Sequence, residues 1–167
     1  MSTPAATGSD RKAHHHLHHA GVRWSRQTPD FRYETYSRTH TWRFGGGAQV
    51  QGSSAPEFRG TAALPNPEEA LVVALSSCHM LSFLAIAARK RLVVERYEDD
   101  AEGEMTEIVR GRLAVTRVVL RPRVTFGGAK RPNAATVDAL HHRAHEECFI
   151  ANSVRTEVTV AHSVVEP

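Results

Sequence analysis

The stretch that decides the fold is NPEEALVVALSSCHMLSFLAIAARKR, residues 66–91. Asn66 is a preferred helix N-cap, Pro67 suits the first helical position, and the two glutamates that follow favour the positive end of the helix dipole. The nineteen residues from Ala70 to Ala88 include no charged side chain, and 15 of them are apolar. We therefore expect a long helix that is apolar around most of its circumference. Such a helix is either a membrane span or the central helix of a core.

The composition of the whole chain favours the central helix of a core. The 167 residues are 41% hydrophobic and 23% charged, as in an ordinary globular protein of one domain. The formal net charge is only +3, and the basic residues are scattered along the chain. We expect no nucleic-acid partner and no association with a membrane.

The regions around this helix are rich in β-strand patterns. We expect strands at 31–44, 48–51, within 92–105, at 112–126 and at 156–161, and a second helix at Thr136–Glu147. This order predicts an α+β fold in which β-rich segments surround a long buried helix. An all-round apolar helix needs cover on every side, and a second copy of the chain would supply it, so we expect a homodimer. The alternative is that the second helix and the strands wrap the central helix within one subunit.

Residues 1–30 have the composition of a flexible tail, and we expect the folded domain to span 31–167. The tail begins with small and polar residues and then contains His14, His15, His16, His18 and His19. Neutral imidazoles are common metal ligands, but no cysteine or carboxylate nearby completes a defined site. We expect a solvated tail that the fold does not need.

The chain contains two cysteines, Cys78 and Cys148. A small secreted scaffold would contain more, so we expect a reducing compartment, the cytoplasm. Isolated cysteines are more often inert core residues than reagents. Both of these, however, lie on helical segments expected to pack together, and polar residues flank each one. A reactive thiolate must be stabilised by a cation, a helix N-terminus or a metal. Cys78 is too far from the N-terminus of its own helix for the dipole to act alone, so a reactive Cys78 would need a cation from elsewhere.

Two motifs resemble the OsmC/Ohr family of peroxide-detoxifying proteins. One is the segment 66–71 followed by Cys78 in a helix of small residues, and the other is Ala-His-Glu-Glu-Cys at 144–148. The resemblance covers roughly residues 36–160. It implies an OsmC-like fold, an intertwined homodimer with buried central helices, and active sites at the subunit interface. The implied activity is cysteine-based reduction of organic hydroperoxides and hydrogen peroxide, without a cofactor or metal.

The resemblance also implies residue roles. Cys78 matches the peroxidatic cysteine and Cys148 the resolving cysteine, and an external dithiol would reduce the disulfide that they form. Apolar neighbours of Cys78 would suit a lipid-like or aryl hydroperoxide, although the same side chains are candidates for core packing. These substrate-binding candidates are Met80, Leu81 and Phe83, next to Leu75.

The activating arginine is the least defined part of the resemblance. Glu68 matches the glutamate that holds it, and Arg59 is our preferred candidate, with Arg43 as a competitor and Arg38 as a third choice. Ten helical residues rise about 15 Å, so Glu68 cannot touch Cys78 of the same straight helix. If the two share a site, the helix breaks or Glu68 comes from the partner subunit.

Two departures from the family pattern leave other functions open. His79 follows Cys78 where an aromatic residue is common, and we consider it a candidate for proton transfer to the leaving alkoxide. Phe149 and Ile150 follow Cys148 where proline is usual. A first alternative is a non-catalytic interaction module in which Cys78 is structural. A second is a metal site made of His141, His145 and Cys148, with His142 or Cys78 as the fourth ligand.

Overall fold

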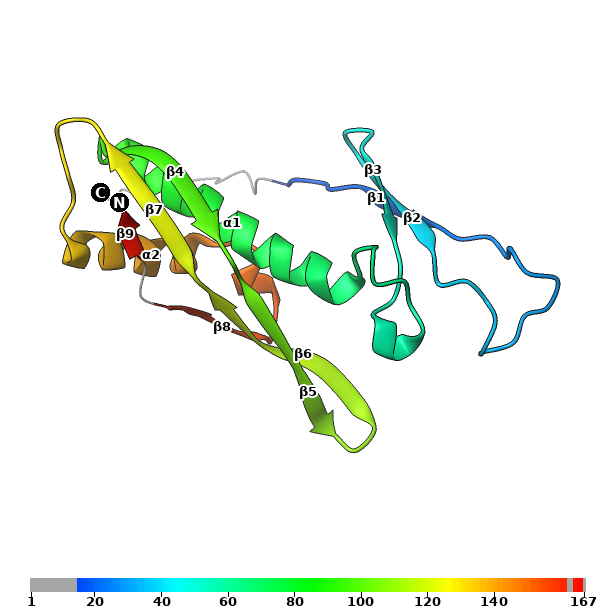
Figure 1. Cartoon of the computed structure of the whole chain (residues 1–167). Coiled ribbons are helices and arrows are strands. Elements are labelled where there is room, and N and C mark those ends of the chain that lie inside the picture. The colour runs from blue at the N-terminus through cyan, green and yellow to red at the C-terminus, as the bar shows by residue number, and fades with distance from the viewer. Residues whose placement is uncertain (1–14, 162–163, 167) are drawn as a thin grey trace, which may run out of the picture.

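The computed structural model describes residues 15–161 and the backbone of 164–166, and this part of the chain forms three small sheets and two long helices. Two of the sheets lie beside the helices, and the N-terminal sheet lies beyond the start of the first helix (Figure 1). The N-terminal sheet contains β1 (Ala20–Arg23), β2 (His40–Phe44) and β3 (Gln49–Gly52). A second sheet has the order β4-β7-β9, with β4 at Val93–Asp99, β7 at Pro122–Gly127 and β9 at Val164–Glu166. A third has the order β5-β6-β8, with β5 at Glu102–Val109, β6 at Arg112–Leu120 and β8 at Glu157–Val160. The helices are α1 (Pro67–Arg89) and α2 (Ala134–Glu147), with short 3-10 turns η1 at Pro56–Phe58 and η2 at Ala151–Ser153. This mixture of elements confirms the predicted α+β fold.

The start of α1 follows the sequence prediction closely. The Asn66 side chain accepts a hydrogen bond from the Glu69 amide at 2.8 Å, and the Glu69 carboxylate accepts one from the Asn66 amide at 3.0 Å. This capping box satisfies two amides that the first helical turn would otherwise leave unpaired. Pro67 occupies the first helical position, as expected. The second helix begins two residues earlier than predicted, behind the N-cap Asn133.

The N-terminal sheet corrects the predicted domain boundary. Residues 20–23 are not part of a tail, because β1 pairs antiparallel with β2 from Ala20 opposite Phe44 to Arg23 opposite Thr41. Residues 1–14, including His14, lie outside the described part of the chain. The strand expected at 31–44 is also shorter than predicted, since it begins only at His40.

The aromatic residues before β2 form a cluster on a loop. The Trp24 and Phe31 ring centroids lie 5.7 Å apart, and those of Phe31 and Tyr36 lie 5.2 Å apart. The Trp24 indole donates a hydrogen bond of 2.6 Å to the Ser37 carbonyl. Their spacing in the sequence therefore imitates a strand, while the chain between residues 24 and 39 forms no strand.

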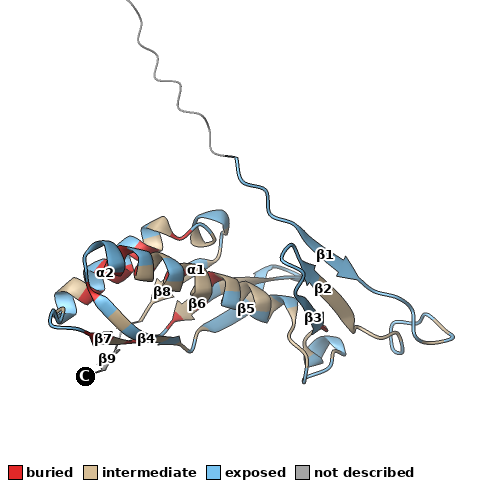
Figure 2. Ribbon diagram, turned by 90° about the horizontal axis from the view of Figure 1, so that it is seen from above, coloured by how far each residue is buried: buried red, intermediate tan, exposed pale blue. Residues whose placement is uncertain are grey.

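Helix α1 is covered on one face by its own chain. Leu75, His79, Phe83 and Ile86 are buried, at the three- and four-residue spacing of a single helix face. On another face, the exposed fractions are 64% for Val73 and 63% for Leu81. Figure 2 shows the same division along α1, with buried residues gathered toward α2 and the sheets. Within one subunit, therefore, one face of α1 is buried as expected, and another face remains exposed.

The core lies in two clusters along the covered face of α1. The larger joins Phe83 and Ile86 of α1 to Val124 and Phe126 of β7 and to Val137, Leu140 and Ala144 of α2. The smaller joins Leu75 to Val118 and Leu120 of β6. By length and composition, α1 is also the one helix in the described part that is apolar enough to cross a membrane, a test that core helices of soluble proteins also pass. Its buried face against α2, β6 and β7 fits the predicted role as a core helix.

Candidate functional site

The structure places the two cysteines of the chain side by side. Cys78 lies in the middle of α1, and Cys148 caps the C-terminus of α2. Both are free thiols. The amides of Ile150 and Ala151, which are adjacent in the chain, donate to the two sulfurs: Ile150 N to Cys78 Sγ at 3.5 Å and Ala151 N to Cys148 Sγ at 3.4 Å. A single short segment therefore contacts both thiols.

This segment, residues 148–153, is itself held in place. The Asn152 amide donates to the Cys148 carbonyl at 3.0 Å, and the Asn152 side chain donates to the Glu146 carbonyl at 2.9 Å. The Ser153 hydroxyl donates to the Phe149 carbonyl at 2.7 Å. The sequence did not predict the amide donors to the two sulfurs, because they are backbone groups and no side-chain motif specifies them.

The two thiols differ in their surroundings. Cys148 is buried, and its pKa is raised to about 11, first by burial and also by the neighbouring thiol of Cys78, while the Ala151 amide acts in the opposite direction. Cys148 therefore stays a neutral thiol near pH 7. Cys78 is half-buried. This asymmetry suits a pair in which Cys78 meets a reagent first and Cys148 reacts afterwards.

Glu68 lies away from the thiols of its own chain. Glu68 is in the first turn of α1, ten residues and about 15 Å of helix before Cys78. Its Oε2 atom is buried and has no hydrogen-bond partner among the described residues. It lines a cavity of about 540 Å³, together with Val73 and, from β5, Met105. A buried carboxylate oxygen without a partner is costly, so this cavity calls for a hydrogen-bond donor or a cation.

The three candidate arginines belong to the region before α1. Arg38 stacks its guanidinium 3.7 Å from the Tyr36 ring centroid and donates to the Tyr36 carbonyl. Arg59 follows η1 in the left-handed conformation, at φ 63°, with its guanidinium 5.5 Å from the Tyr33 ring centroid. Arg43 is exposed on β2. Within the described residues, neither Arg59 nor Arg43 forms an ion pair, so both are available, whereas Arg38 is bound locally.

The predicted substrate-binding residues lie on different faces of α1, because successive positions point in different directions around a helix. Leu81 is exposed and Met80 is half-buried, so both remain accessible from the surface. Phe83 is fully buried, with its ring centroid 4.3 Å from that of His141 and 5.5 Å from that of Tyr97. This burial favours the core-packing alternative for Phe83 over a place in a substrate wall. It lies four residues after His79, on the face of α1 that forms the core.

His79 also differs from its predicted role. Its ring is fully buried, and its Nε2 atom lies 3.0 Å from Nδ1 of His141 on α2, with the rings stacked at an interplanar angle of 4°. Burial lowers the pKa of each of these histidines to about 4, so both are neutral near pH 7. A buried, neutral imidazole turned toward α2 does not serve as the proton donor to an alkoxide. The structure therefore does not support His79 as the group that gives a proton to the leaving alkoxide.

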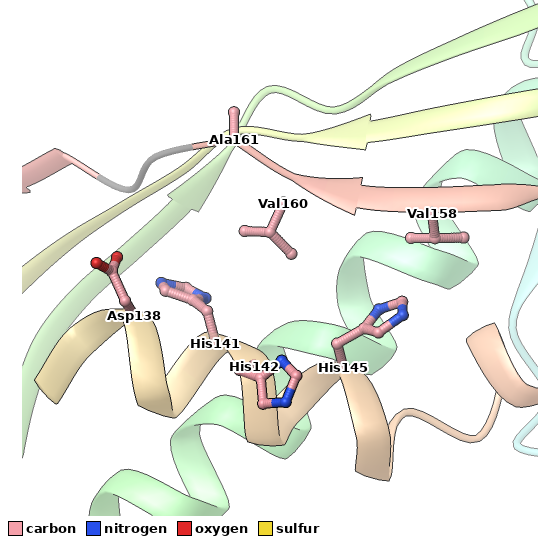
Figure 3. A pocket seen from close by; sticks show the side chains of 7 residues that line it. All are labelled: Asp138, His141, His142, His145, Val158, Val160 and Ala161. Atoms are coloured by element: carbon pink, nitrogen blue, oxygen red, sulfur yellow. The ribbon is translucent and has the colours of Figure 1, made fainter. Parts of the chain in front are cut away.

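The residues of the metal hypothesis do not come together. His141 and His145 line a cavity of about 410 Å³ together with Val158 and Val160 of β8. Figure 3 shows these two histidines extending from α2 toward the strand. Cys148 is not among the residues that line it, and its sulfur faces the segment 150–151 instead. No group of three His, Cys, Asp or Glu side chains in the described part of the chain is arranged to hold a metal ion.

Comparisons with known proteins agree with this geometry. The family profile described as "OsmC-like protein" matches residues 60–163. An OsmC-like protein of unknown function from Vibrio cholerae is 44% identical, with a TM-score of 0.84 over 91% of this chain and 100% of that one. No match was found among curated proteins.

More distant structures share the fold. An organic hydroperoxide resistance protein from Legionella pneumophila is 17% identical, with a TM-score of 0.64 over 90% of this chain and 98% of its own. The organic hydroperoxide resistance protein OhrB of Bacillus subtilis is 15% identical, with a TM-score of 0.59 over 90% and 98%. At these identities the likeness concerns the fold.

Proposed function

Because this chain belongs to the OsmC-like protein family, we propose that it is a cysteine-based peroxidase that reduces organic hydroperoxides and hydrogen peroxide. The observation that carries the proposal is the pair of free thiols, on two different helices, with one short segment donating an amide to each sulfur. An inert core cysteine needs neither a second thiol beside it nor such donors. The hydroperoxide resistance proteins that share the fold support the same substrate class.

The reaction has two chemical steps. The Cys78 thiolate attacks one peroxide oxygen, the O–O bond breaks, and the alkoxide leaves and takes up a proton as the alcohol, so that Cys78 becomes a sulfenic acid. The Cys148 sulfur then attacks the Cys78 sulfur, a disulfide forms, and the hydroxyl group leaves as water with the proton of Cys148. An external dithiol returns both thiols to the reduced state. We expect this reductant and the protein in the cytoplasm, where thiols are kept reduced.

The Cys78 thiolate needs a cation, and we propose that a second copy of the chain supplies it. Arg59 has no ion-pair partner among the described residues, and Glu68, which lines the cavity of about 540 Å³, has a buried oxygen without a hydrogen-bond partner among them. The exposed apolar side chains of α1, Val73 and Leu81, give the two copies a surface to share. In such a homodimer, Glu68 and Arg59 of one chain would meet Cys78 of the other.

The substrate class follows from the side chains next to the thiols. Leu81, one turn after Cys78, is exposed, and so is Phe149, directly after Cys148, at 81%. Large exposed apolar side chains beside a reactive group favour an apolar ligand. We therefore propose that alkyl and aryl hydroperoxides react faster than hydrogen peroxide.

Thiol titration before and after one equivalent of cumene hydroperoxide tests the function. We expect both thiols to disappear in the parent protein, because one peroxide oxidises the pair to a disulfide. Cys78→Ser should keep its remaining thiol, and Cys148→Ser should stop at a sulfenic acid that dimedone traps. If both thiols of the parent survive excess hydroperoxide, the proposal is wrong and the protein is a non-catalytic module of this fold.

A further inference from the structure

The contact between His79 and His141 is the most unusual feature of the core. Two imidazole rings lie in parallel between α1 and α2, with a nitrogen–nitrogen distance of 3.0 Å and exposed fractions of 0% and 4%. The outer nitrogens, His79 Nδ1 and His141 Nε2, are buried without a partner in the described part of the chain. An apolar pair at this place would avoid that cost. The pair places a polar, directional contact in an otherwise apolar part of the core.

The position of this contact relative to the thiols supplies a reason. His79 directly follows Cys78 on α1, and His141 lies seven residues, about two helical turns, before Cys148 on α2. The other core contacts between the two helices are apolar and join Phe83 and Ile86 to Val137, Leu140 and Ala144. At the surface, Arg89 of α1 also pairs with Glu147 of α2 at 3.7 Å, but an exposed ion pair of this length fixes the helices only weakly. Apolar contacts are not directional, so they resist separation of the helices better than small sliding or rotation. A buried hydrogen bond is directional and fixes the register of two packed helices.

We propose that the His79–His141 hydrogen bond is a positioning contact that fixes α2 on α1 and thereby holds the Cys148 sulfur beside Cys78 for disulfide formation. The peroxide-dependent part of this inference rests on the proposed function. The geometric part, the effective concentration of one thiol at the other, does not. Neither histidine touches the reacting atoms, and both act through the helices that bear them.

The chemistry of the pair explains why two histidines serve here. One neutral imidazole donates its N–H and the other accepts it, so each ring meets the other in only one orientation. The ring centroid of His141 also lies 4.3 Å from that of Phe83, one turn after His79 on α1, and this packing keeps the His141 ring from turning. The helix pair is therefore fixed within the apolar contact between α1 and α2, at the residue next to Cys78 on α1.

Two double variants that differ by one methylene group test the inference. The variant with His79→Gln and His141→Asn places an amide near His79 Nε2 and another near His141 Nδ1, so the hydrogen bond can form again. The matched variant with His79→Asn and His141→Asn leaves the first amide one bond short. Both introduce two amides into the same site, and only the first can restore the contact.

The first measurement does not depend on peroxidase activity. Equilibration with a glutathione redox buffer gives the effective concentration of Cys148 toward Cys78 in each variant. We expect the Gln/Asn variant to stay within about threefold of the parent and the Asn/Asn variant to lose about tenfold, as for the coupling of residues in direct contact. Equal values for the two variants would overturn the proposal, since the contact would then not position the thiols.

The second measurement separates the two chemical steps. With cumene hydroperoxide, disulfide formation should slow more in the Asn/Asn variant than the preceding oxidation of Cys78, and dimedone should trap the sulfenic acid that accumulates. A purely structural role would slow both steps together. If the parent protein consumes no hydroperoxide, the proposed function fails, while the glutathione equilibrium still decides the positioning role.

A third variant covers the case in which the Asn/Asn protein does not fold. Replacing both histidines by leucine removes the unpaired nitrogens and is expected to retain the folded state, as thermal unfolding would show. We expect it to lose effective concentration like the Asn/Asn variant, despite its stability. A leucine variant that folds and keeps the parental value would equally overturn the proposal.

Discussion

The N-terminal sheet and the body of the molecule are stabilised in different ways. Neither core cluster includes a residue of β1, β2 or β3, and Figure 2 shows this sheet as largely exposed. The body, formed by α1, α2 and the other two sheets, contains both clusters and both thiols. The sheet and the loop between β1 and β2 instead present apolar side chains to solvent, including Val22 of β1 at 69% and Phe31 of the loop at 64% exposed.

The difference indicates what each region contributes. The body forms its own core and brings the two cysteines together within one chain. The N-terminal region, which also contains Arg59, lacks a core and has an arginine without an ion-pair partner in the described residues. Exposed apolar surface of this kind marks a contact with another chain. We therefore expect the body to be self-sufficient for folding and the N-terminal region to complete the active site of a partner copy.

The largest effect should come from mixing two inactive variants. Cys78→Ser removes the nucleophile, and Glu68→Gln removes the carboxylate proposed to hold Arg59, so each homodimer should be nearly inactive. If Glu68 acts on the partner's Cys78, the mixed dimer has one site with both groups intact. Random exchange should then restore about a quarter of the parental rate of hydroperoxide consumption.

The control for this experiment puts both substitutions in one chain and mixes it with the parent. That mixture also contains intact parental dimers, so only its dependence on mixing ratio is informative. No recovery from the two single variants, after exchange verified by mass spectrometry, would mean that each site is built within one subunit. The contrast between the two regions would then have another cause.

The second prediction separates the covered and uncovered faces of α1. Phe83→Ala should lower the free energy of unfolding by about 3–5 kcal/mol, because it leaves a cavity at a fully buried site. Leu81→Ala, on the exposed face, should change it far less at protein concentrations where the chain is monomeric. Denaturant unfolding measures both. A larger loss from Leu81→Ala would show that the uncovered face is the one that stabilises the chain.

The third prediction concerns acid and the helix pair. The pKa values of His79 and His141 fall from 6.5 to about 4 on folding, so the unfolded chain binds more protons between these values. The stability from these neutral rings is present above pH 6.5 and is lost as the pH falls toward 4, with a slope of up to about 1.4 kcal/mol per pH unit for each histidine.

The titratable groups around His79 and His141 also affect the protonation of the two rings. His145 and Asp138 on α2 and Tyr97 on β4 face the two rings, with His145 opposing the protonation of His79 and Asp138 favouring that of His141. Chemical denaturation at several pH values measures the slope. Replacing both His79 and His141 by leucine should flatten it, whereas His142→Gln, at a residue exposed on α2, should leave it unchanged. A slope that survives the leucine variant would place the acid sensitivity elsewhere.

Local signals explain what the sequence could predict. Asn66, Pro67 and Glu69 define the start of α1 because capping depends on residues three positions apart. The two cysteines could be placed together through the family resemblance and the expected packing of their helices. The pairing of His79 with His141 joins positions 62 residues apart, which no local pattern specifies. One signal was available, because each histidine lies on the apolar face of its helix.

The missed elements depend on contacts outside their own segment. Ala-Gly-Val-Arg at 20–23 lacks an alternating pattern, and β2 alone makes it a strand. The donors from Ile150 and Ala151 are backbone groups, which sequence motifs do not encode. Phe83 is close to Cys78 in the sequence, but the period of the helix places it on the face of α1 that forms the core.

The smallest effect is expected from the aromatic cluster of the N-terminal region. Trp24→Ala removes the hydrogen bond to the Ser37 carbonyl and the ring contacts with Phe31 and Tyr36, worth about 1–2 kcal/mol of local stability. We expect faster hydrogen exchange of the amides in β1, unchanged exchange in α1, and a midpoint of thermal unfolding close to that of the parent. Leu17→Ala, at an exposed residue before β1, is the matched control and should alter neither. Because this sheet shares no core cluster with the body, loosening it should not spread to α1. If Trp24→Ala instead lowers the unfolding midpoint as much as Phe83→Ala does, the two regions fold as one cooperative unit, and the contrast between them is one of exposure rather than of stability.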